Sequence, residues 1–163
     1  MTSVLKVDNI QNSSGTSAIS IDSNGVVTKP VIPAFFARNS THTYITVTQT
    51  VVYDTVSAVG CFNQGGHYST STGKFTAPVD GVYSFAAQFY SNQEAQANMF
   101  WYINDVAIAS SQVNATNDQS NYEGIEMALT LKLDANDKVH ISGASHGYHQ
   151  NSSYSYICGH LVG

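Results

Sequence analysis

The stretch Asn63–Phe85, NQGGHYSTSTGKFTAPVDGVYSF, decides the fold. Gly73 ends a turn rich in Ser and Thr, where we expect a positive φ angle that glycine adopts at little cost. Phe75 then enters a strand that Pro78 must end or leave at a sheet edge, because proline cannot donate a ladder hydrogen bond. The segment therefore predicts a turn, a short strand and a corner.

The end of the same stretch predicts a second strand with an aromatic face. Gly81 opens this strand, and successive side chains of a strand point to opposite faces. Val82 and Ser84 therefore share one face, and Tyr83 and Phe85 share the other. The whole stretch contains no charged pair or metal-type cluster and no nucleophile beside a base, so it specifies architecture.

Residues 31–163 continue as a series of runs rich in β-branched and aromatic residues. Turns rich in Gly, Asn, Asp and Ser separate them, and no run sustains a period of 3.6 residues. Many short strands at such spacing predict an all-β sandwich or barrel. The strand-like runs are 34–39, 44–56, 74–78, 81–91, 98–110, 122–133, 138–145 and 153–163.

Residues 1–30 form a separate region with two short alternating runs, 3–11 and 17–29, and a hairpin-type turn at Ser23–Gly25. A segment this small cannot bury a face alone, because isolated hairpins are marginal in water. It must pack on the main domain or on copies of itself. We therefore predict two regions, 1–30 and 31–163, with prolines marking the boundary.

Composition narrows the function of the 163-residue chain. Only 10% of its residues are charged, the net charge is −5, and six basic residues give no footprint for nucleic acid. No apolar run is long enough for membrane insertion, and the N-terminus does not read as a signal peptide. Cys61 and Cys158 lie in apolar contexts that favour buried thiols, although a bridge between them stays open.

The spacing of the decisive stretch resembles the globular head domain of complement component 1q. The similarity continues in FWYIND (100–105), with Asp105 in place of a glycine, in LTLKLDANDKVHI (129–141), with Asn136 in place of another, and in YICGHLV (156–162). The resemblance implies a jelly-roll β-sandwich related to tumour necrosis factor, assembled as a homotrimer. The residues that it places in the fold or trimer core are Tyr68, Phe75, Gly81, Tyr83, Phe85, Phe100, Trp101, Tyr102 and Gly159.

Residues 1–30 look like the short β-repeat that precedes head domains in fibre and decoration proteins of tailed bacteriophages. This resemblance implies a virion structural protein, a fibre tip or capsid decoration, that anchors to other virion proteins through residues 1–30. The chain has no Gly-X-Y run of the kind that precedes animal head domains. The alternative is a secreted trimeric ligand or lectin-like binding module of cellular origin.

No pattern in the sequence predicts an enzyme, because no nucleophile elbow or other catalytic context is present. Histidines near a threefold axis could chelate a metal, yet His146 and His149 sit in a polar segment that favours an exposed loop. Asp134 and Asp137, with Asn136, offer oxygens that suit Ca²⁺, but a solvated turn is preferred. We therefore expect no cofactor, with Ca²⁺ as the one ion to test.

Three segments rich in amides, hydroxyls and Tyr are candidate binding loops: 91–98, 113–124 and 144–155. Tyr offers rigid amphipathic contact, and Asn and Ser offer adaptable hydrogen bonds, a mixture that suits a host-surface glycan or protein. The same loops could equally be inert caps of the sandwich. The surface-binding candidates are Tyr122, His146, Tyr148, His149 and Asn151.

Overall fold

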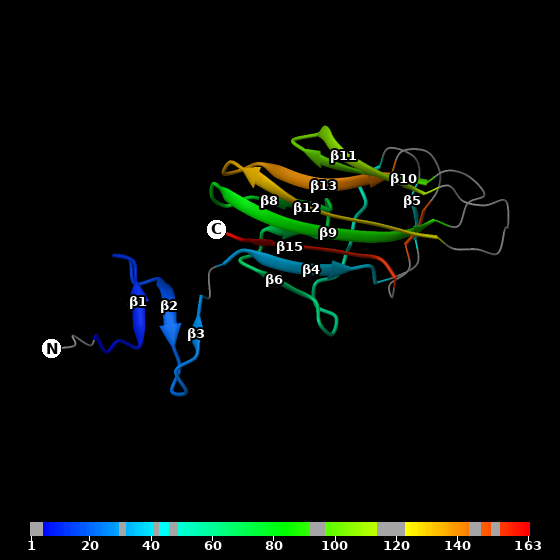
Figure 1. Cartoon of the computed structure of the whole chain (residues 1–163). Helices are drawn as coiled ribbons and strands as arrows, with labels where there is room; N and C mark the ends of the chain where they lie inside the picture. Colours follow the sequence, from blue (N-terminus) through cyan, green and yellow to red (C-terminus); the bar gives the residue numbers. More distant parts are fainter. Residues whose placement is uncertain are drawn as a thin grey trace. The chain divides into compact units, whose positions relative to one another are not determined.

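The structure is a computed structural model in which all regular elements are β-strands (Figure 1). It describes residues 5–29, 32–40, 43–45, 49–91, 97–113, 123–143, 148–150 and 154–163. Across these residues there is no helix of the length and apolarity that a membrane span requires. The chain divides into two compact units, Met1–Ile32 and Pro33–Gly163, and each is described separately.

The N-terminal unit is a three-stranded antiparallel sheet in the order β1-β2-β3. Its strands are β1 (Asn9–Gln11), β2 (Ser17–Ile21) and β3 (Val27–Thr28).

The turn between β2 and β3 is held by one carboxylate. Asp22 Oδ1 accepts the backbone N–H groups of Asn24 at 2.9 Å and Val26 at 2.8 Å. Gly25 has a φ of 81°, which supplies the left-handed position of the turn. The predicted hairpin turn at Ser23–Gly25 is therefore confirmed.

The second unit, the head, is a sandwich of two sheets. One sheet has the order β11-β10-β13-β8-β7. The other has the order β5-β14-β9-β15-β4-β6. Off this path, β12 pairs with the whole length of β9. The bounds are β4 (Ala34–Arg38), β5 (Thr43–Ile45), β6 (Phe62–Gln64), β7 (Tyr68–Ser69), β8 (Lys74–Thr76), β9 (Gly81–Ser91), β10 (Ala97–Ile103), β11 (Val106–Val113), β12 (Glu123–Leu133), β13 (Lys138–Gly143), β14 (Tyr148–Gln150) and β15 (Tyr156–Leu161).

The decisive stretch folds as its pattern predicts. Gly73 has a φ of 69°, and a β-carbon there would lie 2.5 Å from the carbonyl oxygen of Val51, so both conformation and space require glycine. Phe75 faces inward from β8. In β9, Tyr83 and Phe85 are buried, and the alternate positions face away from the core.

Aromatic rings fill the space between the two sheets. The ring of Phe35 stacks on Tyr68 at 4.6 Å and on Phe75 at 5.3 Å. Phe85 meets Phe75 edge-on at 5.4 Å and lies 5.9 Å from Trp101. Offset and edge-on contacts of this kind add stabilisation beyond the apolar area that they bury. The core is thus complete within one chain.

The prediction of one long strand over residues 44–56 is wrong. β5 ends at Ile45, and the described residues 49–56 make two isolated bridges, Thr50 with Ser142 of one sheet and Thr55 with Arg38 of the other. This extended segment crosses between the two sheets. Its alternating pattern is nevertheless that of a strand, because crossing between two sheets buries every second side chain.

Candidate interaction face

The candidate site is formed by residues on the outward side of β9, β15 and the strands paired with them. Side chains that pair across antiparallel strands point to the same face of the sheet. The register joins Ala128 to Ala86, Ala86 to Cys158, Cys158 to Phe36, and Phe36 to Phe62. These five residues form one continuous line across β12, β9, β15, β4 and β6, which we name the apolar row.

The apolar row points away from the core. Its sequence neighbours Phe85, Ile157 and Phe35 are buried against the opposite sheet, so the intervening positions face outward. Within the row, Phe62 is 46% exposed and Ala128 is also exposed. Ala86, Cys158 and Phe36 between them are partly buried. An outward-facing apolar line with exposed ends is a candidate interaction surface.

A polar row runs beside the apolar row. It pairs Glu126 with Gln88, Gln88 with Tyr156, and Tyr156 with Arg38. The hydroxyl of Tyr156 donates to Glu126 Oε1 at 3.1 Å, and partial burial together with this carboxylate raises the pKa of the tyrosine. The two charged residues therefore lie on β12 and β4, at opposite ends of the row.

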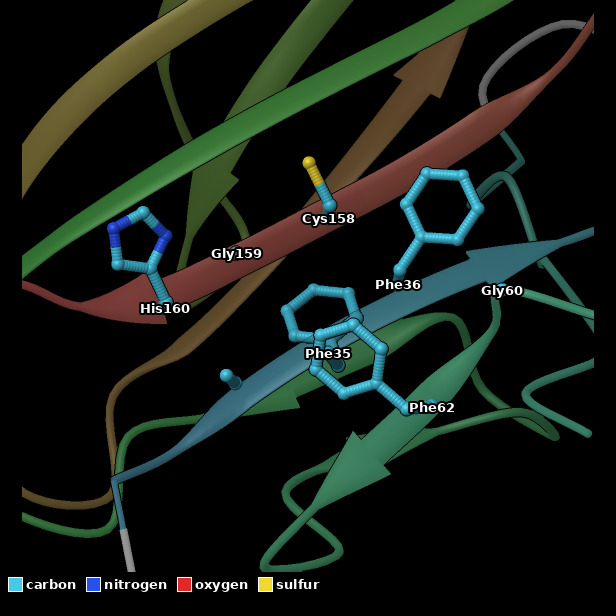
Figure 2. A pocket seen from close by; sticks show the side chains of 8 residues that line it. Phe35, Phe36, Gly60, Phe62, Cys158, Gly159 and His160 are labelled. Atoms are coloured by element: carbon cyan, nitrogen blue, oxygen red, sulfur yellow. The ribbon is translucent and has the colours of Figure 1, made fainter. Parts of the chain in front are cut away.

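A hollow of about 590 Å³ lies at the phenylalanine end of the apolar row (Figure 2). Its walls come from β4, β6, β15 and the turn at Gly60. The ring of Phe36 also stacks on Tyr156 at 5.7 Å, and burial raises the pKa of the Cys158 thiol. The lining residues are Ala34, Phe35, Phe36, Gly60, Phe62, Cys158, Gly159 and His160.

The outward face of the other sheet is built differently. Lys74 Nζ lies 2.6 Å from Asp105 Oδ1, which lowers the pKa of that carboxyl group. His140 is 5% exposed, its Nε2 lies 3.8 Å from Asp105 Oδ1, and its ring stacks on Tyr102 at 5.0 Å. Burial and the nearby Lys74 lower the pKa of His140. Lys74 and Asp105 on this face therefore pair within one chain.

The comparisons with known proteins agree with this architecture. The C1q domain family matches residues 34–162. The chain belongs to the C1q domain family. Among solved structures, the globular domain of zebrafish complement 1qA protein has a TM-score of 0.64 and 22% identity, covering 81% of this chain and 98% of that one. The Eiger TNF structure from S. frugiperda also has a TM-score of 0.64, with 12% identity, covering 81% of this chain and 93% of that one.

The predicted jelly-roll β-sandwich is therefore confirmed for the C1q domain. Domains of this family are generally binding modules without catalytic activity, and they typically form homotrimers. The chain must accordingly be considered for the surfaces that it offers to partners.

Most of the predicted core aromatics lie inside a single C1q domain. The side chains of Tyr68, Phe75, Tyr83, Phe85 and Trp101 are each at most 3% exposed. They are core residues and are not available to a neighbouring subunit.

Phe100 and Tyr102 alternate with Trp101 along β10, so they face outward and are partly exposed. They belong to the outward face of the sheet that carries Lys74 and Asp105, and the register pairs Tyr102 with His140. The run FWY thus divides between the core and that surface.

Two glycines of the C1q domain are required by close packing. A β-carbon on Gly159 would lie 2.4 Å from the Phe85 ring and 2.9 Å from that of Phe35. On Gly81 it would lie 2.7 Å from Leu161 Cδ1. Both glycines are therefore needed for packing within the domain.

Two of the binding-loop candidates lie in a strand, and three lie outside the described residues. Tyr148 and His149 lie in β14, which pairs with β5 and with the end of β9, so their assignment to a loop is wrong. A three-residue extended run among Ser, Asn and Gly carries too little pattern to reveal a strand. Tyr122, His146 and Asn151 lie outside the described residues.

In the acidic turn considered for Ca²⁺, both carboxylate oxygens of Asp137 are engaged in the fold. Asp137 Oδ2 accepts the backbone N–H of Asp134 at 2.9 Å, and its Oδ1 accepts Asn104 Nδ2 at 2.7 Å. Within the described parts of the chain no three His, Cys, Asp or Glu residues gather as a metal site. The two cysteines, Cys61 and Cys158, are free and partly buried.

Sequence reasoning missed the apolar row, although one signal was present. In β9 and β15 the outward positions Ala86 and Cys158 are apolar or small as well as the inward ones. Strands that are apolar on both faces are expected to be covered on both faces. The row itself could not be found, because it depends on the register between five strands.

Proposed function

We propose that this chain is a homotrimeric binding module whose subunits meet through the apolar row. The observation that carries the proposal is the outward-facing line of apolar side chains from Ala128 to Phe62, exposed at both ends, in a domain whose own core is already complete. Covering such a face removes apolar area from water, which stabilises an assembly. An oligomer of C1q domains provides that cover.

The two ends of the face favour a head-to-tail contact. The apolar row carries alanines on β12 and β9 and phenylalanines on β4 and β6. The polar row carries Glu126 at the alanine end and Arg38 near the phenylalanine end. A contact between unlike ends pairs large side chains with small ones and opposite charges with each other. Repeated with a rotation of one third of a turn, such a contact closes into a three-membered ring.

An arginine placed in the apolar row tests the interface. Ala128→Arg adds a charge on an exposed strand position of the row, and Ala107→Arg adds the same charge on an exposed position of β11 in the other sheet. Sedimentation velocity at micromolar concentration should give a trimer for the unmodified chain and for Ala107→Arg, and monomer for Ala128→Arg. An unmodified chain that remains monomeric would refute the proposal, as would a trimer that tolerates Ala128→Arg.

We further propose that the trimer is a virion structural protein of a tailed bacteriophage, acting as a fibre tip or capsid decoration. The support is the separate three-stranded unit before the head, which resembles the β-repeats of phage fibre and decoration proteins. In this proposal the unit anchors to other virion proteins, and three heads contact a host-surface glycan or protein. Three linked weak contacts gain by multivalency, often by about a hundredfold or more.

Particle incorporation tests the virion role. Phage particles assembled with the full chain should carry the protein through density-gradient purification. A chain without residues 1–30 should keep a folded trimeric head but be absent from the particles. Equal incorporation of both chains would refute the anchor. Recovery of the full chain only as a free protein would instead favour a secreted trimeric ligand or lectin-like module of cellular origin.

A further inference from the structure

The N-terminal unit has one apolar face and one polar face. The register pairs Ile10 with Ile19 and Ile21 with Val27, and Ile19 and Ile21 are two residues apart on β2, so all four share a face. We name these four residues the N-terminal apolar face. The opposite face carries the polar partners of Ser20, which are Asn9 on β1 and Thr28 on β3.

This face is exposed on its two outer strands and half-buried on β2, where Ile19 and Ile21 lie. Ile10 is 47% exposed and Val27 is 58% exposed. The strands NIQ, SAISI and VT contain no charged residue, so desolvating the face requires no burial of charge from the strands themselves. A sheet of three, five and two residues has no second layer of its own.

We infer that the N-terminal apolar face packs against the same face of two other copies, forming a three-sided β-clamp that locks the trimer. The inference rests on the proposed trimer of heads, which brings three copies of the face together. Only residues 29–33 separate β3 from β4 in the chain. A short tether of this kind holds linked segments at millimolar effective concentration, so each copy is the most abundant partner for the next.

The chemistry of the face suits identical copies. Four branched aliphatic side chains from three strands make a surface with neither charge nor hydrogen-bonding groups to match, so a like surface is a complementary one. Three such sheets arranged around an axis bury their aliphatic faces and expose Asn9, Ser20 and Thr28 to water. The clamp also leaves these polar faces free to contact other virion proteins.

A carboxylate placed on one face of β2 or on the other distinguishes loss of the clamp from general damage to the N-terminal unit. Ile19→Asp places a carboxylate in the N-terminal apolar face, and Ser20→Asp places the same carboxylate on the polar face one residue away. In the full chain, Ile19→Asp should raise the concentration at which trimers dissociate at least tenfold, measured by sedimentation on dilution. Ser20→Asp should leave that concentration within a factor of two of the unmodified chain.

Pyrene fluorescence provides a test that keeps the face apolar. In a Cys61→Ser, Cys158→Ala background that still sediments as a trimer, the full chain carrying Val27→Cys and labelled with pyrene maleimide should show excimer emission. The matched Ser20→Cys chain in the same background should not. Excimer emission that is equal or absent in both labelled trimers would overturn the clamp, as would equal dissociation of the two Asp variants. Those outcomes leave the head trimer standing, whereas a monomeric unmodified chain would contradict the proposed function itself.

Discussion

The two sheets of the head differ in what they present on their outward sides. The sheet containing β12, β9, β15, β4 and β6 carries an apolar row that is continuous across all five strands. The sheet containing β10, β13 and β8 carries an ion pair between Lys74 and Asp105 beside the stacked rings of Tyr102 and His140. Both sheets contribute buried side chains to one core, so the inner faces define the fold, and the outer faces are available for contacts with partners.

The largest expected effect comes from the glycine that joins the core to the interaction face. A β-carbon at Gly159 would meet the rings of Phe85 and Phe35, so Gly159→Ala should lower the free energy of unfolding by about 1–3 kcal/mol through overpacking. Denaturant titration of the purified variant measures the change. Gly163→Ala is the control, because a β-carbon there meets nothing within 4 Å. Equal stability of both variants would contradict the packing described here.

Removing one aromatic ring from each outward face should affect association on one face and stability on the other. Phe62→Ser removes a half-exposed ring from the apolar row, and Tyr102→Ser removes a ring stacked on His140. Phe62→Ser should weaken trimer association about tenfold or more, as the loss of a central aromatic contact does in other interfaces. Tyr102→Ser should instead lower the unfolding temperature and leave association unchanged. Sedimentation measures association and thermal melting measures stability. Weaker association in Tyr102→Ser but not in Phe62→Ser would contradict the difference between the two faces.

A smaller effect is expected in the turn between β12 and β13. Asn136 has a φ of 76°, a conformation that glycine adopts more readily than other residues. Asn136→Gly should therefore raise the free energy of unfolding by about 0.5 kcal/mol. Thermal melting measures this change, with Ala135→Gly, a neighbouring exposed turn residue, expected to be neutral or destabilising. A loss of stability in Asn136→Gly would show that the Asn side chain itself matters.

The smallest expected effect is a pH dependence of stability that comes from His140 on β13. Because the pKa of His140 is lowered in the fold, the unfolded chain binds a proton that the folded chain binds more weakly. Stability should therefore fall as the pH decreases from the ordinary histidine pKa, about 6.5, towards the lower folded value. Thermal melts between pH 7 and pH 5 should show this slope, and His140→Gln should reduce it. An unchanged slope in His140→Gln would assign the effect to other groups.

Local sequence patterns determined most of the fold. The alternation over 81–91 coincides with β9, and the positive φ expected at Gly73 is present. Asp105 and Asn136, which stand where the related domains have glycine, adopt φ angles of 65° and 76°. Such features depend on neighbours in the chain, so a single sequence is sufficient to reveal them.

Long-range pairing decided the interaction surfaces. Whether Tyr83 faces the core or another subunit depends on the sheet opposite, which joins the neighbouring strand β8 to β13 and β10 from later in the chain. Likewise, Ala128 and Phe62 belong to one apolar row only because four strand registers align them. The sequence by itself therefore determined the all-β class, the turns at Gly25 and Gly73, and which residues of β9 share a face. Tertiary structure alone decided which outward residues meet, because register is a property of paired strands and is absent from any one of them.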